Sequence, residues 1–411
     1  SPTSASSPTR SSNAPDQGAT TTSRNNGCCP EPQASVSCLA LESLSRARQG
    51  CSACGMFNIL TDAGSKTGHL IIRKQQRKHH HMATSITVKA GPHSRLNSPV
   101  TVALASPLDT SKTYAVRCAE GKTVPAQIVK AADGVQQLFF ILPELAAKQD
   151  LTLTVVEAPL PLNTLKLEQA DDTINVKANG KLFTTLHYGG NWVRPFMHPV
   201  IGPYGSNLTR SYPMVEGVPG EPKDHPHQKS FWTAWGDVNG TDNWSELERG
   251  HGTIKTTAVT ILENGPVRGK VALALDWLSD KGEKQMVENR ELTYYQLPGN
   301  DSIVDLKVVF TATNGDIKFG DTKEGGICSI RVASSMDAKL NGTIVNAYGA
   351  IGEAETWGKR AAWCDYYGPV PGGVAGICIM DHPDNYCYPT YWHVRNYGLM
   401  TANPFGLSYF H

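Results

Sequence analysis

The sequence predicts an all-β protein in which a small Ig-like sandwich precedes a large antiparallel β-sandwich. From residue 84 onward, short β-branched or aromatic runs alternate with turns rich in Gly, Pro and Asn, and no segment keeps a helical period over three turns. The chain has 411 residues, enough for two or three domains. We therefore expect a leader over residues 1–81, a small sandwich over 84–158 and a large sandwich over 165–411.

The leader differs in composition from the rest of the chain. It is rich in Ser, Thr, Asn, Gln and Pro, poor in aromatic residues, and ends in a basic run at 73–81. Such a segment buries too little apolar surface to fold alone, so we expect it to be disordered or not a functional module. Two interpretations stay open: an organelle transit segment, or a biological chain that begins at Met82, which we favour.

The small sandwich is predicted from six short runs that mostly alternate between apolar and polar residues. Turns separate them at the roughly 8–15-residue spacing that is typical of a sandwich. One helical turn is expected over 144–149, and a linker over 158–163. The six expected strands are 85–90, 100–105, 114–119, 126–131, 137–142 and 151–156.

The large sandwich begins with a predicted hairpin over 173–188. Asn179 and Gly180 stand between two alternating runs, and Asn-Gly is the strongest short-range hairpin signal. Two longer stretches, 253–278 and 286–315, predict an antiparallel meander, because Gly, Pro and Asn turns interrupt runs of strand-forming residues.

Composition excludes several kinds of partner. The formal net charge is +1, from 38 basic and 37 acidic residues, so nothing favours nucleic acid or an anionic membrane surface. No apolar run approaches the roughly 18 residues that a membrane helix needs. Five of the ten cysteines are scattered among apolar or aromatic neighbours from residue 118 onward and suit buried free thiols in a reducing compartment. We therefore favour a soluble cytoplasmic protein, with organelle and secreted locations open. Exposed strand edges leave self-association open.

Two polar clusters lie between residues 191 and 244, on backbone fixed by Pro and Gly. Arg194 and His198 form the first, and His225 and His227 the second. In an extended segment, residues i and i+2 face the same side, so these last two imidazoles can converge on one ligand or metal ion. Nearby tryptophans offer flat faces that suit sugar rings.

A third cluster lies in a Gly-bounded turn that holds Asp321, Lys323 and Glu324. A carboxylate beside an ammonium group shifts the pKa values of both and prepares a general acid or base. The fourth cluster is near the C-terminus, where His393 and Arg395 share one face of a strand. Arginine is the natural anchor for a carboxylate or a vicinal diol.

These clusters define the candidate site, with a small-molecule or carbohydrate ligand. A divalent metal ion remains open as a cofactor, with two tentative ligands, His225 and His227. The expected catalytic residues are Glu324, Asp321, His225, His227, Lys323 and His393. The expected substrate-binding residues are Arg194, His198, Trp235, Asp237, Trp392 and Arg395.

Six motifs follow one another along the second half of the chain: RPFMHP, DHPHQ with AWGDVNG, GDTKEGG, WGKRAAWCDYYG, DHPDN, and VRNYGL with NPFG. In this order they resemble the motifs of the "methane oxygenase PmoA-like" family, which is of unknown function. The resemblance covers about residues 165–411, and one position departs from it: Gln228 stands where the family motif DHPHH ends in histidine. The resemblance implies a soluble β-rich protein, a galactose-mutarotase-like supersandwich, and genes found beside sugar-oxidising dehydrogenases.

Three functions follow as hypotheses. The leading one is a carbohydrate-active enzyme, a lyase, hydrolase or epimerase that acts on a sugar or oxidised sugar by His/carboxylate acid–base chemistry. The second, suggested by the family label, is a metal-dependent oxygenase, in which two histidines and Asp224, Asp237 or Glu324 would hold iron. The third is a non-catalytic sugar-binding or assembly protein. Catalysis gains support if the polar clusters share one cleft.

Overall fold

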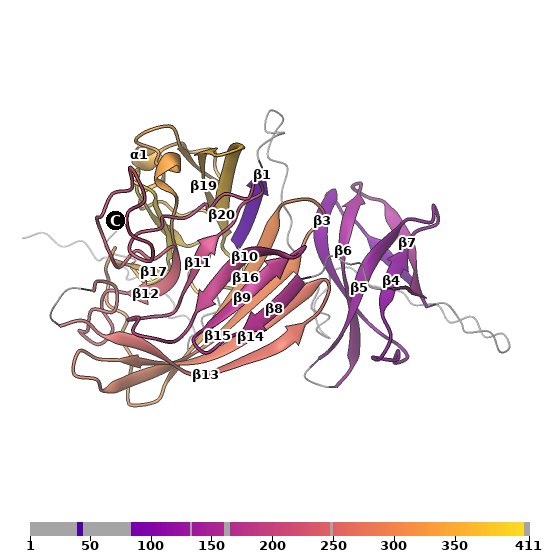
Figure 1. Ribbon diagram of the computed structural model, residues 1–411, viewed down its shortest axis with the longest axis horizontal. Coiled ribbons are helices and arrows are strands. Elements are labelled where there is room, and N and C mark those ends of the chain that lie inside the picture. Colours follow the sequence, from indigo (N-terminus) through magenta and orange to yellow (C-terminus); the bar gives the residue numbers. More distant parts are fainter. Residues whose placement is uncertain (1–38, 44–83, 132–133, 160–164, 247–249, 407–411) are drawn as a thin grey trace, which may run out of the picture. The chain divides into compact units, whose positions relative to one another are not determined.

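A computed structural model describes residues 39–43, for which only the backbone is considered, together with 84–131, 134–159, 165–246 and 250–406. This part of the chain forms strands β1 to β22, one short helix α1 (Glu353–Thr356) and one 3-10 turn (Ser334–Met336), so the all-β prediction is confirmed (Figure 1). Neither helical segment in the described ranges has the length and apolar character needed to span a bilayer.

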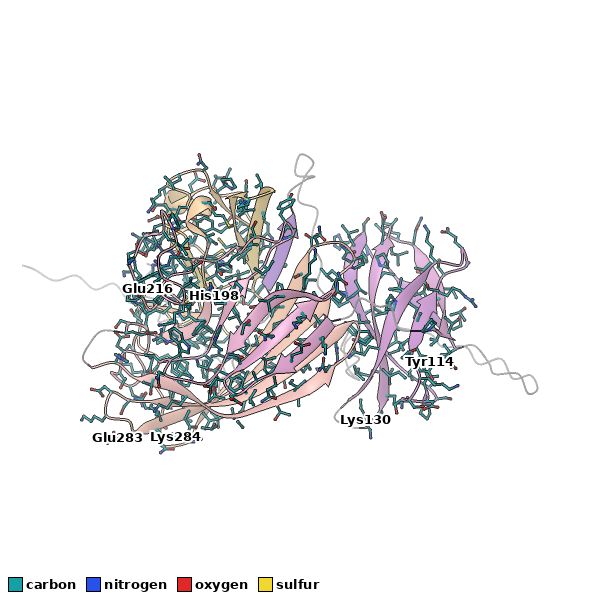
Figure 2. The ribbon with its side chains drawn as sticks, viewed as in Figure 1. Tyr114, Lys130, His198, Glu216, Glu283 and Lys284 are labelled. Atoms are coloured by element: carbon teal, nitrogen blue, oxygen red, sulfur yellow. The ribbon has the colours of Figure 1, made fainter. Side chains whose placement is uncertain are left out.

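The small unit is one six-stranded antiparallel sheet, and strands from its whole width contribute to a shared apolar core that includes Ile86, Val116, Leu138 and Phe140. Figure 2 shows Tyr114 and Lys130 in this unit. Across the sheet the strands are β2 (Ser85–Lys89), β7 (Asp150–Glu157), β4 (Tyr114–Arg117), β5 (Thr123–Lys130), β6 (Gln136–Leu145) and β3 (Arg95–Ala103).

The helical turn expected over 144–149 is wrong. Strand β6 continues to Leu145, which is buried and pairs with Arg95, and Lys148 takes a positive φ of 64° in the turn before β7. Glu, Leu, Ala and Lys favour helix locally, but burial of Leu145 in the core of the sheet outweighs that weak preference.

The large unit consists of two eight-stranded antiparallel sheets whose facing sides form one core. Trp277, Leu306 and Ile377 enter it from the first sheet, and Ile174 and Met400 enter it from the second. The first sheet contains, in order across it, β13 (Thr253–Asn264), β14 (Arg268–Leu278), β15 (Lys284–Gln296), β16 (Ser302–Ala312), β1 (Leu39–Ser43), β20 (Gly373–Met380), β19 (Trp363–Val370) and β18 (Thr343–Asn346). The second contains β21 (Tyr391–Val394), β22 (Leu399–Asn403), β17 (Gly325–Arg331), β12 (Phe231–Trp235), β11 (Phe196–Val200), β10 (Lys181–His187), β9 (Thr173–Ala178) and β8 (Leu165–Gln169).

Both predictions for the large unit, the hairpin and the antiparallel meander, are confirmed. Asn179 and Gly180 have φ values of 53° and 74° and join β9 to β10, as expected of a tight hairpin turn. Strands β13, β14, β15 and β16 follow one another as an antiparallel meander. Of the predicted leader, only β1 is described, and it pairs with β16 and β20; the other predictions for residues 1–81 lie outside the described residues.

An ion pair lies inside the core of the large unit. Glu288 and Arg290 are two residues apart on β15, so both point to the core side, and their side chains are 0% and 4% exposed. Arg290 Nε donates to Glu288 Oε1 at 2.5 Å, and Trp277 Nε1 donates to Glu288 Oε2 at 2.7 Å. The carboxylate therefore depends on two buried partners.

The second sheet carries a smaller apolar cluster on its other face. On β12, Phe231 points into the main core, whereas Trp232 packs with Phe196, Trp244 and Leu399 in the separate cluster. Trp244 comes from the chain that follows β12. Loop residues therefore cover this face of the sheet, and the polar clusters predicted from the sequence gather among them.

Candidate functional site

The segment from Asp224 to Gln228 is held by two buried arginines. Arg331 Nη2 lies 3.1 Å from Asp224 Oδ1, and Arg210 Nη1 contacts the same oxygen. Arg210 Nη2 also donates to the His225 carbonyl at 2.7 Å. Burial alone would raise the pKa of Asp224, but the charges of Arg331 and Arg210 outweigh it and hold that pKa below its usual value. Asp224 therefore stays ionised.

His225 is the partly exposed imidazole of this segment. Its backbone adopts a left-handed φ of 43°, and its side chain is 40% exposed. The ring stacks on Tyr397, with centroids 5.2 Å apart and planes 11° apart, and Nδ1 lies 3.4 Å from Asp224 Oδ2. Since Nδ1 faces the carboxylate, Nε2 is the nitrogen left for a ligand.

His227 lies beside His225, with ring centroids 5.7 Å apart. Arg194 Nη1 donates to the His227 carbonyl at 3.3 Å. Burial, followed by the positive charge of Arg194, lowers the pKa of His227 to about 3, so its imidazole is neutral at pH 7. Arg194 itself is 1% exposed and pairs with Glu246 Oε1 at 2.9 Å. It therefore connects the backbone at His227 to the side chain of Glu246 inside the protein.

His393 on β21 brings the C-terminal cluster to the same place. Its side chain is buried, and burial, followed by the charge of Lys323, lowers its pKa to about 3; the charges of Arg395 and His225 act in the same direction. Lys323 forms a direct ion pair with Glu324, and burial, followed by Arg395, lowers the pKa of Lys323. The ring of Tyr397 lies against both His225 and Arg395, and His393 forms a hydrogen bond with the backbone of Lys323. The turn before β17, the end of β21 and the 224–228 segment therefore form one constellation.

The ring of Tyr397 lies against both Arg331 and Arg395 and so connects the buried arginines to this constellation. The guanidinium of Arg331 lies 4.6 Å from the centre of its ring and that of Arg395 5.7 Å. Burial raises the pKa of Tyr397, although a side-chain hydrogen bond with Gln228 opposes the shift. Gln228 Oε1 also accepts a hydrogen bond from Arg331 Nη1. The residue that departs from the DHPHH motif therefore belongs to the buried framework.

The structure thus brings together six of the predicted site residues, and Arg194 is buried next to one of them, His227. Two other candidates, Trp235 and Trp392, are 0% exposed and belong to the core of the sandwich. Trp235 Nε1 donates to the Gly320 carbonyl at 3.0 Å, and Trp392 Nε1 to that of Ala361 at 2.9 Å. Their indoles are satisfied inside the protein and offer no face to a ligand. The residues brought together are His225, His227, Lys323, Glu324, His393 and Arg395.

The remaining candidates have other surroundings. His198 on β11 is buried, and burial followed by the charge of His187 lowers its pKa to about 4; Figure 2 shows it in the large unit. Asp237 Oδ1 accepts a hydrogen bond from the Gly240 backbone at 2.8 Å and so shapes a turn. Asp321 is exposed in the turn that leads to Lys323.

Sequence reasoning does not predict the place of four residues in the constellation. It offers Asp224 as a possible metal ligand and gives no site role to Arg210, Arg331 or Tyr397. The one usable signal was an arginine inside an apolar strand run, Ser-Ile-Arg-Val-Ala at 329–333. A charged side chain in such a run is buried only when it has a partner, so it indicates a polar network.

The sequence also predicts His225 and His227 as tentative metal ligands. Within the described ranges, no three His, Cys, Asp or Glu side chains form a group able to hold a metal ion. Asp224, the nearest carboxylate to His225, is engaged by Arg210 and Arg331.

The buried histidines predict loss of stability in acid. The pKa of His393 falls from an ordinary 6.5 to about 3 in the folded protein, so between those values the unfolded chain binds more protons. The free energy of unfolding should therefore be highest above pH 6.5 and fall as the pH drops toward 3, by up to about 1.4 kcal/mol per pH unit from this histidine. Urea unfolding from pH 7.5 to 4.5 measures this slope. His393→Gln should flatten it, and an unchanged slope in that variant would contradict the assignment.

Comparison with known proteins identifies the family. Residues 173–411 match DUF6807, a family of unknown function, and this range holds every residue of the constellation. A search of curated proteins gives no match. Since the matched range covers more than half of the chain, the protein belongs to the DUF6807 family.

Proposed function

We propose that this protein is a carbohydrate-active enzyme that transfers a proton on a sugar or an oxidised sugar, with His225 as the proton-transferring group. The observation that carries the proposal is the way His225 is held: Asp224 lies beside Nδ1, Tyr397 stacks on the ring, and Arg210 binds the carbonyl. A left-handed φ on a non-glycine residue costs on the order of 1–3 kcal/mol and persists where surrounding contacts enforce it, often at functional sites.

The neighbours of His225 have separate roles in this proposal. Lys323 pairs with Glu324 and Arg395 pairs with Glu353. Both cations are still partly exposed, at 31% and 35%, so they can approach a ligand and stabilise negative charge that develops on it. His393 is neutral at pH 7 because its pKa is about 3, which makes it a hydrogen-bonding group and a poor base.

Electrostatics favour a lyase or epimerase over a hydrolase. Most glycoside hydrolases use two carboxyl groups on either side of the bond, one of them protonated. Asp224 cannot supply that proton, because Arg331 and Arg210 hold its pKa low, and Glu324 is ion-paired with Lys323. Proton abstraction next to a sugar carboxylate needs one base and nearby cations, which this constellation contains.

The proposal keeps the galactose-mutarotase-like supersandwich that the family resemblance implies. Two packed eight-stranded antiparallel sheets support that relationship. One fold carries many chemistries, so the assignment of proton transfer rests on the residues around His225.

Glu324→Gln is expected to lower turnover of the active sugar acid by about two orders of magnitude, because Lys323 loses the carboxylate that fixes the position of its ammonium group beside the ligand. The assay incubates the full chain with hexuronic and aldonic acids in D2O and follows deuterium uptake or unsaturated products by NMR. Glu283→Gln is the matched control, since Glu283 is exposed at the turn before β15 (Figure 2).

Three results would count against this function. They are near-wild-type turnover of Glu324→Gln, equal losses in both variants, and tight binding of sugar acids without any exchange or product. The last result would favour the non-catalytic binding protein.

A further inference from the structure

The large unit contains an open hollow that is lined by none of the residues around His225. Its volume is about 290 Å³, and three segments line it: 178–183 around the β9–β10 turn, 201–205 after β11, and residues between 295 and 302 at the β15–β16 turn. The volume is close to the lower end of the roughly 300–1,000 Å³ that small-molecule sites occupy. A single sugar ring is a suitable occupant for such a space.

Uncharged polar side chains form part of the lining. Asn179, Asn300 and Ser302 come from two different turns, and Gln296 lies at the end of β15. Gln296 Nε2 donates to the Leu297 carbonyl at 3.1 Å, and its Oε1 is buried, so this side chain is a fixed part of the wall. Asn179, Asn300 and Ser302 carry the amide and hydroxyl groups that can bind the hydroxyl of a ligand.

Tyr204 gives the hollow an aromatic wall. Its side chain is 39% exposed and rests on two glycines of the β19–β20 turn. A Cβ atom on Gly373 would lie 2.7 Å from Tyr204 Cζ, and one on Gly372 would lie 2.9 Å from Tyr204 Cβ, so a larger residue at either position would displace the ring. Ser206 Oγ donates to the Pro371 carbonyl at 2.9 Å and fixes the same turn. The ring is thus supported from one side and lines the hollow.

We infer that this hollow is a second ligand site and that it binds a neutral sugar ring. Amide and hydroxyl groups match the hydroxyls of a sugar, and a fixed tyrosine ring packs against its C–H face. One positive side chain, Lys181, and one negative one, Asp301, also line the hollow and leave it without net charge. A neutral ligand therefore suits it better than the sugar acid proposed for His225, and the inference does not depend on proton transfer there.

The test titrates the full chain with methyl glucoside, methyl galactoside and methyl mannoside by saturation-transfer NMR and calorimetry. At least one should bind, Tyr204→Ala should weaken that binding about tenfold, and Tyr204→Phe should change it less than about threefold, since the ring remains. Asn300→Ala should weaken it several-fold, which covers the case of a Tyr204→Ala protein that fails to fold. Tyr348→Ala is the matched control, because Tyr348 is 72% exposed and does not line the hollow.

His225→Asn should leave the binding of these glycosides unchanged, which separates this site from the proposed catalytic one. The inference is overturned by the absence of binding to all three glycosides, or by unchanged binding in folded Tyr204→Ala and in Asn300→Ala. It is also overturned if His225→Asn removes the binding, or if free amino acids, whose two charges would match Lys181 and Asp301, compete at lower concentration than the glycosides.

Discussion

Replacing His225 by asparagine is expected to lower turnover of a sugar acid by about two to four orders of magnitude while the protein stays folded. The imidazole is the proton-transferring group in our proposal, and asparagine keeps a polar side chain without a titratable nitrogen. The partly exposed position of His225, above the buried arginines, makes the substitution compatible with folding. Steady-state rates at pH 7, with circular dichroism as the fold check, measure the effect.

His93→Asn is the matched control, since His93 is exposed in the small unit. Asp224→Asn should also lower turnover, because it removes the carboxylate beside Nδ1 and loosens the contact with Arg331. A His225→Asn protein that retains more than a tenth of the wild-type rate would remove His225 from the mechanism, and the proposal would have to move to another residue.

The largest expected effect on stability comes from Arg290→Met. Removing this guanidinium leaves Glu288, which is 0% exposed, without its charge partner inside the core. Breaking a buried ion pair from one side typically costs about 3–5 kcal/mol. Urea unfolding at pH 7 should show a loss of that order in the free energy of unfolding.

The control for this prediction removes both charges. In Glu288→Gln with Arg290→Met, the glutamine can still accept from Trp277 Nε1, and no uncompensated charge remains. The double variant should therefore be more stable than Arg290→Met alone. A single variant that loses less than about 1 kcal/mol, or a double variant that is less stable than the single one, would contradict the assigned role of the pair.

The strands were predictable because the alternation of apolar and polar residues is a local property of the sequence. On β21, the two-residue period places Trp392 and Val394 on one face and His393 on the other, and the structure confirms this alternation, since the first two enter the main core. The same alternation predicts that Trp392 lies in the core, as the structure shows. The amphiphilic indole suits a ligand site as well as a core, so residue type alone does not distinguish the two.

The partners of the buried charges could not be predicted, because they depend on contacts between distant segments. The triad Asp-His-Pro occurs twice, at 224–226 and 381–383, with the same local sequence. Asp224 is bound by Arg210 and Arg331, from more than ten residues away, whereas Asp381 accepts from Asn385 Nδ2 at 2.7 Å and the Thr390 backbone at 2.7 Å. One triad therefore presents a histidine above buried arginines, and the other closes a loop.

The central claim is that the residues around His225 form one ligand site. Difference density from a crystal soaked with mixed hexuronic and aldonic acids tests it most directly. We predict a ligand within hydrogen-bond distance of His225 Nε2, with its carboxylate beside Lys323 or Arg395. Density for these acids only at other places on the protein, with the surroundings of His225 unchanged at saturating concentration, would contradict the account.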